Sequence, residues 1–165
     1  MKLVDKVIEF CPATPGGELA ILDIDCKAGA LLSKIKAKFE GRGEYYGIAK
    51  HDILYEIASL YHEVVKGDFS ENAGMFSNEK FDFVVCEDFR LTNIETLGEI
   101  RRLLKKEGKF IFTASTDTDV QKLGVVLFGA DFDVTLINGV YSKEETEEPD
   151  YYIAVVERDD GKEKQ

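Results

Sequence analysis

Apolar and polar positions alternate along this chain as short buried strands separated by helices that have one apolar face. Residues 18–23 form a near-continuous apolar run, which is typical of a strand covered on both faces. Residues 28–39 carry apolar side chains at helical spacing, and Gly41 and Gly43 end this helix. The same unit repeats, with further strands predicted at 44–48, 64–65, 81–85 and 109–113. This order predicts an α/β fold with a mostly parallel sheet.

Both ends of the chain extend this pattern into a single domain over residues 1–158. Apolar positions within 2–10 would share one face of a short N-terminal helix. Residues 132–140 and 151–157 are predicted strands, and the short acidic loop between them cannot hold a crossover helix. These two strands should therefore pair antiparallel, which gives the sheet one reversed strand near its edge. Residues 159–165 are expected to form a polar tail.

The remaining helices are predicted from residues that favour a helix start. Asp52 can cap the helix that follows the second strand. Thr92 and Glu95 form a capping box for the next helix, which should end at Gly108. A last helix is predicted at 117–128. In the helix after Asp52, the apolar residues are expected to face inward: Ile53, Leu54, Ile57, Leu60 and Tyr61.

The charge of the chain restricts its partners. The formal net charge is -11, and nucleic acid is disfavoured because its binding depends on Lys and Arg. A local basic patch stays open as an alternative at Arg101, Arg102, Lys105 and Lys106. No apolar run is long enough to cross a bilayer, and the N-terminal segment carries acids where a signal peptide would be apolar. We therefore expect a cytoplasmic protein without a membrane partner.

The cysteines and histidines give no indication of a metal site. Cys11, Cys26 and Cys86 are odd in number and lack metal-ligand spacing, so reduced thiols are expected. His51 and His62 have no carboxylate or cysteine at ligand spacing. A cysteine nucleophile with His51 as its base is an alternative, although buried cysteines more often act as small apolar side chains.

The segment LAILDIDCKAGALL contains the first candidate for chemistry. An apolar strand ends at Asp23, turns through small and acidic residues, and opens directly into a helix. Free backbone N–H groups at such a helix start hold anionic or polar ligands in α/β folds. The turn is nevertheless poor in glycine, so the layout of a binding site is present while part of its usual chemistry is absent.

Several segments, in this order and spacing, resemble the class I S-adenosylmethionine (SAM)-dependent methyltransferases over residues 18–158. LDIDCKAG stands where that family has L-D-x-G-x-G-x-G, and GIAKHDILYEIA matches its second-strand pattern. VVKGDFSE resembles the segment whose acid contacts adenine. FDFVVCED and EIRRLLKKEGKFIFT resemble the fourth strand, the following helix and the fifth strand. The resemblance implies a three-layer Rossmann-like fold with an antiparallel terminal strand, and SAM as the cofactor.

The resemblance also implies roles for residues of the first turn. Asp23 matches the acid that organises the loop around the amino acid end of the cofactor, with backbone groups around Cys26 in contact with it. Gly29 matches the last glycine of the motif. Asp25 replaces the first glycine and Lys27 the second, and a side chain at either place can crowd the cofactor.

Further cofactor contacts are implied at the ends of the next strands. Ala49, followed by Lys50, stands where the family has an acid that holds both ribose hydroxyls; its loss should weaken binding by roughly 1–3 kcal/mol. Asp68 keeps the acid expected to meet the adenine amino group, and Phe69 can stack on the ring. Cys86 is the contact expected at the end of the fourth strand.

Two acids are the candidates for chemistry at the fourth strand. Glu87 and Asp88 follow Cys86, where methyltransferases place contacts to the acceptor, and either carboxylate can take a proton from an amine or a hydroxyl group. Such acids would also favour a positively charged cofactor. The alternative is that they only solvate the loop at the strand end.

Two functions therefore stay open. The first is a SAM-dependent methyltransferase with an unusual first motif and an unknown acceptor. The second is a non-catalytic module with the same fold, which has lost cofactor binding and serves interaction or regulation, with a protein partner or as a homodimer. A nicotinamide-binding domain has less support because G-x-G-x-x-G is absent.

Overall fold

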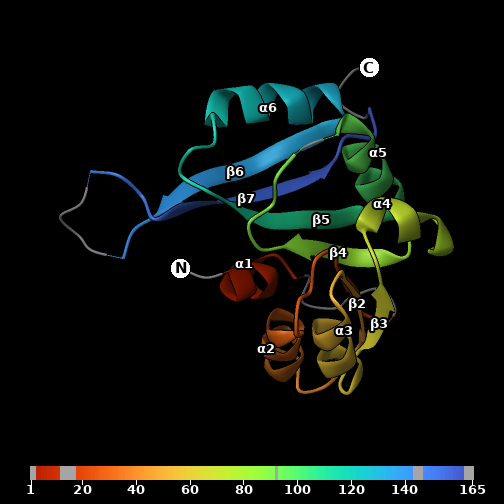
Figure 1. Ribbon diagram of the computed structural model, residues 1–165. Coiled ribbons are helices and arrows are strands. Elements are labelled where there is room, and N and C mark those ends of the chain that lie inside the picture. The colour runs from red at the N-terminus through yellow and green to blue at the C-terminus, as the bar shows by residue number, and fades with distance from the viewer. Residues whose placement is uncertain (1–2, 12–17, 92, 143–146, 162–165) are drawn as a thin grey trace.

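The fold is centred on one sheet with helices on both faces (Figure 1). The computed structural model describes residues 3–11, 18–91, 93–142 and 147–161, and seven strands within these ranges form the sheet. The elements in chain order are α1 (Leu3–Phe10), β1 (Ala20–Asp23), α2 (Ala30–Lys38), β2 (Glu44–Ala49), α3 (Asp52–Ser59), β3 (Glu63–Lys66), α4 (Phe69–Asn72), a 3-10 turn (Ala73–Met75), β4 (Phe81–Cys86), α5 (Ile94–Leu103), β5 (Leu104–Ala114), α6 (Val120–Gly129), β6 (Phe132–Val140) and β7 (Tyr151–Arg158).

The strand order confirms the predicted topology. The sheet runs β3-β2-β1-β4-β5-β7-β6, and the strands from β3 to β5 are all parallel. β7 lies between β5 and β6 and is antiparallel to both, so it is the reversed strand. Because the first five strands are parallel, their carboxyl ends meet at one edge of the sheet, where α/β folds bind ligands.

Two apolar cores hold the three layers together. α1, α2 and α3 cover one face of the sheet, while α4, α5 and α6 cover the other (Figure 1). β1 is central and buried along its whole length, as its apolar run predicts. On the α4–α6 face, Phe110 and Phe112 of β5 stack at 4.6 Å between ring centroids, and Phe89 meets both edge-on.

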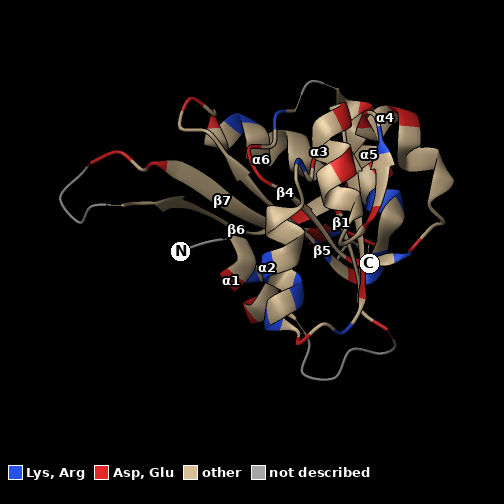
Figure 2. Ribbon diagram, turned by 60° about the horizontal axis from the view of Figure 1, so that its bottom comes forward, with Lys and Arg blue, Asp and Glu red and all other residues tan. Residues whose placement is uncertain are grey.

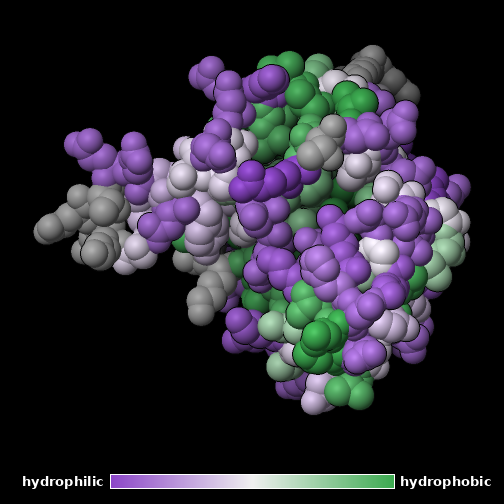
Figure 3. Space-filling view, in the orientation of Figure 1, coloured by the Kyte–Doolittle hydropathy of each residue, from purple (hydrophilic) through white to green (hydrophobic). Residues whose placement is uncertain are grey.

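The prediction that α3 turns its apolar residues inward is wrong for four of the five. Ile53, Ile57, Leu60 and Tyr61 are exposed, with Ile53 at 71% and Leu60 at 74%. The helix instead buries Ala58, a small residue that lets α3 lie close to the α2 start. Figure 3 shows apolar surface gathered over this part of the molecule, in the lower half of the view.

Several helix ends differ from the prediction. Asp52 is the first residue of α3 rather than its cap: His51 takes the cap position, and the Asp52 carboxylate pairs with Lys66 on β3. Thr92 lies outside the described residues; Asn93 caps α5, and its side chain accepts a hydrogen bond from the Glu95 N–H at 3.0 Å. α5 ends at Leu103 rather than near Gly108, because the chain enters β5 directly at Leu104 and pairs with β4 there.

Two other segments were also mispredicted. Asp119 caps α6 and its side chain accepts from the Lys122 N–H, so α6 begins three residues later than predicted. The short helix α4 was not predicted. The N-terminal helix runs from Leu3, since residue 2 lies outside the described ranges.

Three of the four residues of the suggested basic patch pair with acids. Lys105 pairs with Asp82 at 2.9 Å, Arg102 pairs with Glu99 at 2.8 Å, and Arg101 contacts Asp160. Figure 2 shows Lys and Arg interspersed with Asp and Glu over the helices. Within the described ranges, no helix has the length and apolar character needed to span a membrane.

Candidate functional site

A cavity lies at the edge of the sheet where the parallel strands end. This central cavity, of about 620 Å³, is bounded by the loops that follow β1, β2, β3 and β4. It holds five of the residues predicted to contact a cofactor, namely Asp25, Lys50, Asp68, Phe69 and Cys86. Its other lining residues are Ile24, Ser70, Asp88, Phe89, Arg90, Asn93 and Thr96. The volume is in the range of small-molecule sites.

Asp23 ends β1 and directly precedes Ile24 and Asp25, which line this cavity. It is only 2% exposed, and its Oδ1 accepts a hydrogen bond from the Asp25 N–H at 3.1 Å, which fixes the first step of the turn. Burial raises the pKa of the carboxyl to about 7, and the nearby charges of Asp25 and Glu87 act in the same direction. The hydrogen bond from Asp25 and the charge of Lys27 oppose this rise. Asp23 therefore titrates near neutral pH.

The turn after β1 is tightly seated on β2. Lys27 and Gly29 have left-handed backbone conformations, with φ of 51° and 90°, whereas Asp25 does not. The Cys26 N–H donates to Ile48 O at 2.9 Å, and a Cβ on Gly47 would lie 2.6 Å from Cys26 Sγ. Gly47 and Ile48 of β2 are thus in close contact with the turn.

Gly29 is the position where the glycine of the motif is required by geometry. It has a left-handed conformation at the start of α2, and an added Cβ would lie 3.0 Å from Cδ2 of His62. The Lys27 position has a left-handed conformation with a side chain, which costs roughly 1–2 kcal/mol. Asp25 imposes no such strain, so its effect on a ligand is one of charge and volume.

The ends of β2 and β3 are joined by an ion pair. Lys50 Nζ lies 3.3 Å from Asp68 Oδ1, and both side chains are about half exposed at the wall of the central cavity. Ala49 is fully buried and does not line the cavity. Phe69 lines it but is also buried in the core, so little of its side chain is exposed to a ligand.

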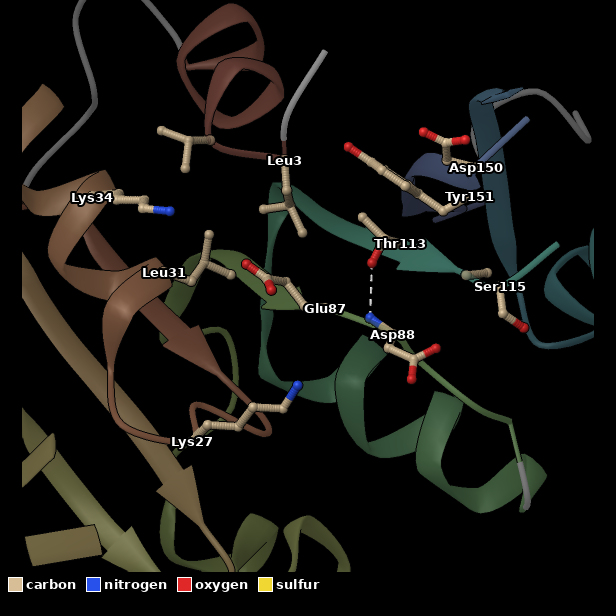
Figure 4. A pocket seen from close by; sticks show the side chains of 12 residues that line it. Leu3, Lys27, Leu31, Lys34, Glu87, Asp88, Thr113, Ser115, Asp150 and Tyr151 are labelled. Carbon is tan, nitrogen blue, oxygen red and sulfur yellow. Dashed lines mark hydrogen bonds between the residues drawn. The ribbon is translucent and has the colours of Figure 1, made fainter. Parts of the chain in front are cut away.

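Asp88 has a special position after β4. It has a left-handed backbone conformation with φ of 55°, and its N–H donates to Thr113 Oγ1 at 2.7 Å. The next N–H, of Phe89, donates to Thr113 O at 2.8 Å. These bonds fix the loop to β5, and strained backbone of this kind is frequent at functional sites. Asp88 lines the central cavity and also a second cavity of about 490 Å³, drawn in Figure 4.

The two cysteines at the site are not activated. Burial raises the pKa of Cys26 to about 12, and it raises the pKa of Cys86 well above its ordinary value; the negative charges of Asp23 and Asp25 add to both effects. A thiol nucleophile needs a lowered pKa. The alternative of a nucleophilic cysteine is therefore disfavoured. No cluster of three or more metal-ligating side chains is found among the described residues.

The structure brings together some predicted residues and separates others. Cys26, Gly29 and Ala49 support the turn or lie in the core without lining the central cavity. Sequence reasoning missed Ser70, Asn93 and Thr96, which line it from α4 and α5. The position of Asn93 and Thr96 at the start of α5 was available as a signal, whereas Ser70 depends on the unpredicted α4.

Comparison with known proteins agrees with this geometry. No protein-family model matches the chain. The chain is 30% identical over 104 residues to a ribosomal protein L11 methyltransferase of Fusobacterium nucleatum, which covers 57% of this chain and 32% of that relative. The chain thus spans about a third of the length of the curated relative that it matches.

Solved structures with the same fold include SAM-dependent methyltransferases. One from Archaeoglobus fulgidus has a TM-score of 0.72 at 16% identity, covering 94% of this chain and 93% of its own. One from Mesorhizobium loti has a TM-score of 0.77 at 11% identity, covering 93% and 96%. A chain from the complex between the Haloferax volcanii Trm112 methyltransferase activator and a methyltransferase has a TM-score of 0.72 at 15% identity, covering 95% and 89%. The protein has the Rossmann-like fold of class I SAM-dependent methyltransferases.

Proposed function

We propose that the protein is a SAM-dependent methyltransferase whose cofactor binds in the central cavity. The observation that carries this proposal is the position of the cavity, which lies at the carboxyl edge of β1, β2 and β4 in a methyltransferase fold. Asp25 and Asp88 line the cavity, and their negative charge suits a ligand that carries a sulfonium and an ammonium group. The residues present therefore fit the cofactor.

Different lining residues would contact different parts of the cofactor. Asp68, Lys50 and Asn93 offer acceptors and donors for the polar groups of an adenosine, while Phe69 and Phe89 add apolar surface. Asp25 lies at the end next to the β1 turn. When bound, SAM supplies an electrophilic methyl group; the protein aligns the acceptor behind that group and excludes water. Little proton transfer is needed beyond removal of one proton from the acceptor.

A non-catalytic module is the second candidate. Three features favour it. Position 49 is an alanine and offers no carboxylate to the ribose. Lys50 and Asp68 form an ion pair with each other at the cavity wall, and Lys27 adds a side chain at the turn. Each of these lowers the affinity expected for SAM. The two candidates differ in one measurable property, which is the binding of the cofactor.

Calorimetric titration with SAM and with S-adenosylhomocysteine separates the two. Micromolar binding, lost in Asp68→Ala and kept in Glu56→Gln on the exposed surface of α3, supports the methyltransferase. Thermal stabilisation by the ligand gives an independent readout. Absence of binding at millimolar ligand in the folded protein would refute it and leave the non-catalytic module.

Location and partners are part of the same proposal. We expect a cytoplasmic protein, because Cys11, Cys26 and Cys86 are all free thiols. A protein partner or a second copy is supported by the exposed apolar residues of α3. Cell fractionation tests the first expectation, and sedimentation of the purified protein tests the second.

A further inference from the structure

The second cavity has an apolar side and a charged side. This α1–β7 cavity has a volume of about 490 Å³ and lies beside the central cavity. Its apolar side consists of Leu3 and Val4 from α1 and Leu31 from α2, all of which are buried (Figure 4). A ligand in this cavity would therefore place a hydrocarbon segment against α1 and α2.

Carboxylates dominate the other side. Glu87 and Asp88 line the cavity from the loop after β4, with their carboxylates pointing to opposite sides in Figure 4, and Asp150 lines it from the position before β7. Lys27 and Lys34 stand on the α2 side (Figure 4). The three lining carboxylates outnumber the two lysines. Arg90 Nε, 3.9 Å from Asp88 Oδ2, offsets one of these negative charges, whereas the charge of Asp5 acts on the Tyr151 wall with the same sign as Glu87 and Asp150.

The side chain of Tyr151 reports the same sign of charge. Burial raises the pKa of its hydroxyl, and Glu87, Asp150 and Asp5 raise it further. Negative potential at this wall favours a cationic ligand group over a neutral or an anionic one. The polar lining is completed by the hydroxyl groups of Thr113 and Ser115.

Asp88 is the residue that the two cavities share. Its backbone is fixed by Thr113, since the Asp88 N–H donates to Thr113 Oγ1 at 2.7 Å. A group transferred from a ligand in the central cavity to one in the α1–β7 cavity would therefore pass beside the Asp88 carboxylate.

We propose that the α1–β7 cavity binds the methyl acceptor, and that this acceptor is an amine on an apolar stem. The inference rests on the proposed function. The ammonium form is attracted by the carboxylates of Glu87, Asp88 and Asp150, and its stem packs on Leu3 and Leu31. The amine gives one proton to the Asp88 carboxylate, which passes it to solvent, and the free nitrogen lone pair attacks the methyl carbon of SAM. The C–N bond forms while the C–S bond breaks, and its electron pair stays on sulfur, giving a methylammonium product and neutral S-adenosylhomocysteine.

Four probe compounds test the preference for a cation. n-Hexylamine, 1-hexanol and hexanoate are unbranched six-carbon chains that differ in charge, and Nα-acetyl-lysine amide carries a primary amine on an amino acid. Each is titrated into the protein saturated with S-adenosylhomocysteine. We expect at least one of the two amines to bind about tenfold or more tightly than the alcohol, and hexanoate to bind most weakly. The ranking of the two amines tells a small-molecule acceptor from a side chain of a protein.

Variants connect the binding to the named residues. Asp88→Asn should lower kcat/KM for the better amine about 100-fold or more, with a smaller change in its Kd, because it removes the proton acceptor. Asn tolerates the left-handed backbone of Asp88, so this variant should fold. Asp150→Asn should weaken amine binding without changing SAM binding, and Glu56→Gln on α3 should change neither.

The outcomes separate this inference from the proposed function. If SAM binds but the alcohol or hexanoate is preferred, or Asp150→Asn leaves amine affinity unchanged, the amine inference is refuted and the proposed function stands. If SAM does not bind at all, both are refuted. Amine binding and methyl transfer that are sensitive to Asp88 and Asp150 support the inference.

Discussion

Replacement of Asp23 by Asn should make the protein more stable than the wild type as pH rises. In the folded state burial holds the pKa of Asp23 at about 7, against 3.8 for an ordinary aspartate. The unfolded carboxyl therefore ionises from about pH 4 upward while the folded one keeps its proton, so stability is lost between these two pKa values. The full loss above about pH 7 is about 4 kcal/mol, at about 1.4 kcal/mol for each pKa unit.

The measurement compares urea unfolding of wild type and Asp23→Asn at about pH 4.5 and about pH 8. The free energy of unfolding of the variant, relative to the wild type, should rise by about 3 kcal/mol between these conditions. A constant offset from the buried amide cancels in this comparison. Asp52→Asn is the matched control. Lys66 lowers the pKa of this surface carboxyl, so Asp52 changes the stability of the protein with pH only at pH values below the tested range. Parallel pH curves for the wild type and Asp23→Asn would refute the reasoning.

Three other predictions follow from the same structure. The positive charges of SAM favour the ionised form of Asp23, so binding of SAM near neutral pH should release a proton from this carboxyl and should become tighter as pH rises. Binding heats measured in two buffers of different ionisation enthalpy give the number of protons released, and Asp23→Asn should abolish this release. Gly47→Ala should cost about 1–3 kcal/mol in chemical denaturation because its Cβ would lie 2.6 Å from Cys26 Sγ, and Cys26→Ala should recover part of that loss; additive losses would contradict the contact. Ile53→Lys should change the free energy of unfolding by less than about 0.5 kcal/mol, whereas a loss of several kcal/mol would show that this side chain is buried.

The order of the strands and of the longer helices was predictable from the sequence. Continuous apolar runs such as residues 18–23 predict strands covered on both faces, and the short connection before β7 requires an antiparallel strand. Helix ends were less predictable. Helix α5 ends at Leu103 and strand β5 begins at the next residue, Leu104. Neither residue is a glycine or a proline, so no local signal in the sequence marks this helix end.

The inward face of α3 was not predictable from periodicity. Ile53, Ile57, Leu60 and Tyr61 lie at helical spacing, but so do Leu54 and Ala58, and either stripe can face a core. Contact with Gly29 decides between them: a Cβ there would lie 3.4 Å from the Ala58 Cβ, so only a small residue fits. That requirement depends on residues far apart in the chain.

The candidate site was predictable where a residue lies at the end of a strand or within two residues of it. Asp25, Lys50, Asp68 and Cys86 line the central cavity because parallel strands end at one edge. Their roles toward SAM stay predictions. The sharing of Asp88 by two cavities was not predictable, because it depends on the packing of α1 and the β7 start against the loop after β4.

Because Cys26 and Cys86 react slowly in the folded protein, their alkylation rates can be used to follow local opening at the candidate site. Both thiols are buried and their pKa values are raised, so they react slowly with an alkylating reagent until the surrounding segment opens, whereas Cys11 is partly exposed. The alkylation rate of Cys26 then measures how often the turn after β1 separates from β2, and that of Cys86 measures opening at the end of β4. Site-resolved mass spectrometry would thus time the opening of each wall separately, without any label added to the chain.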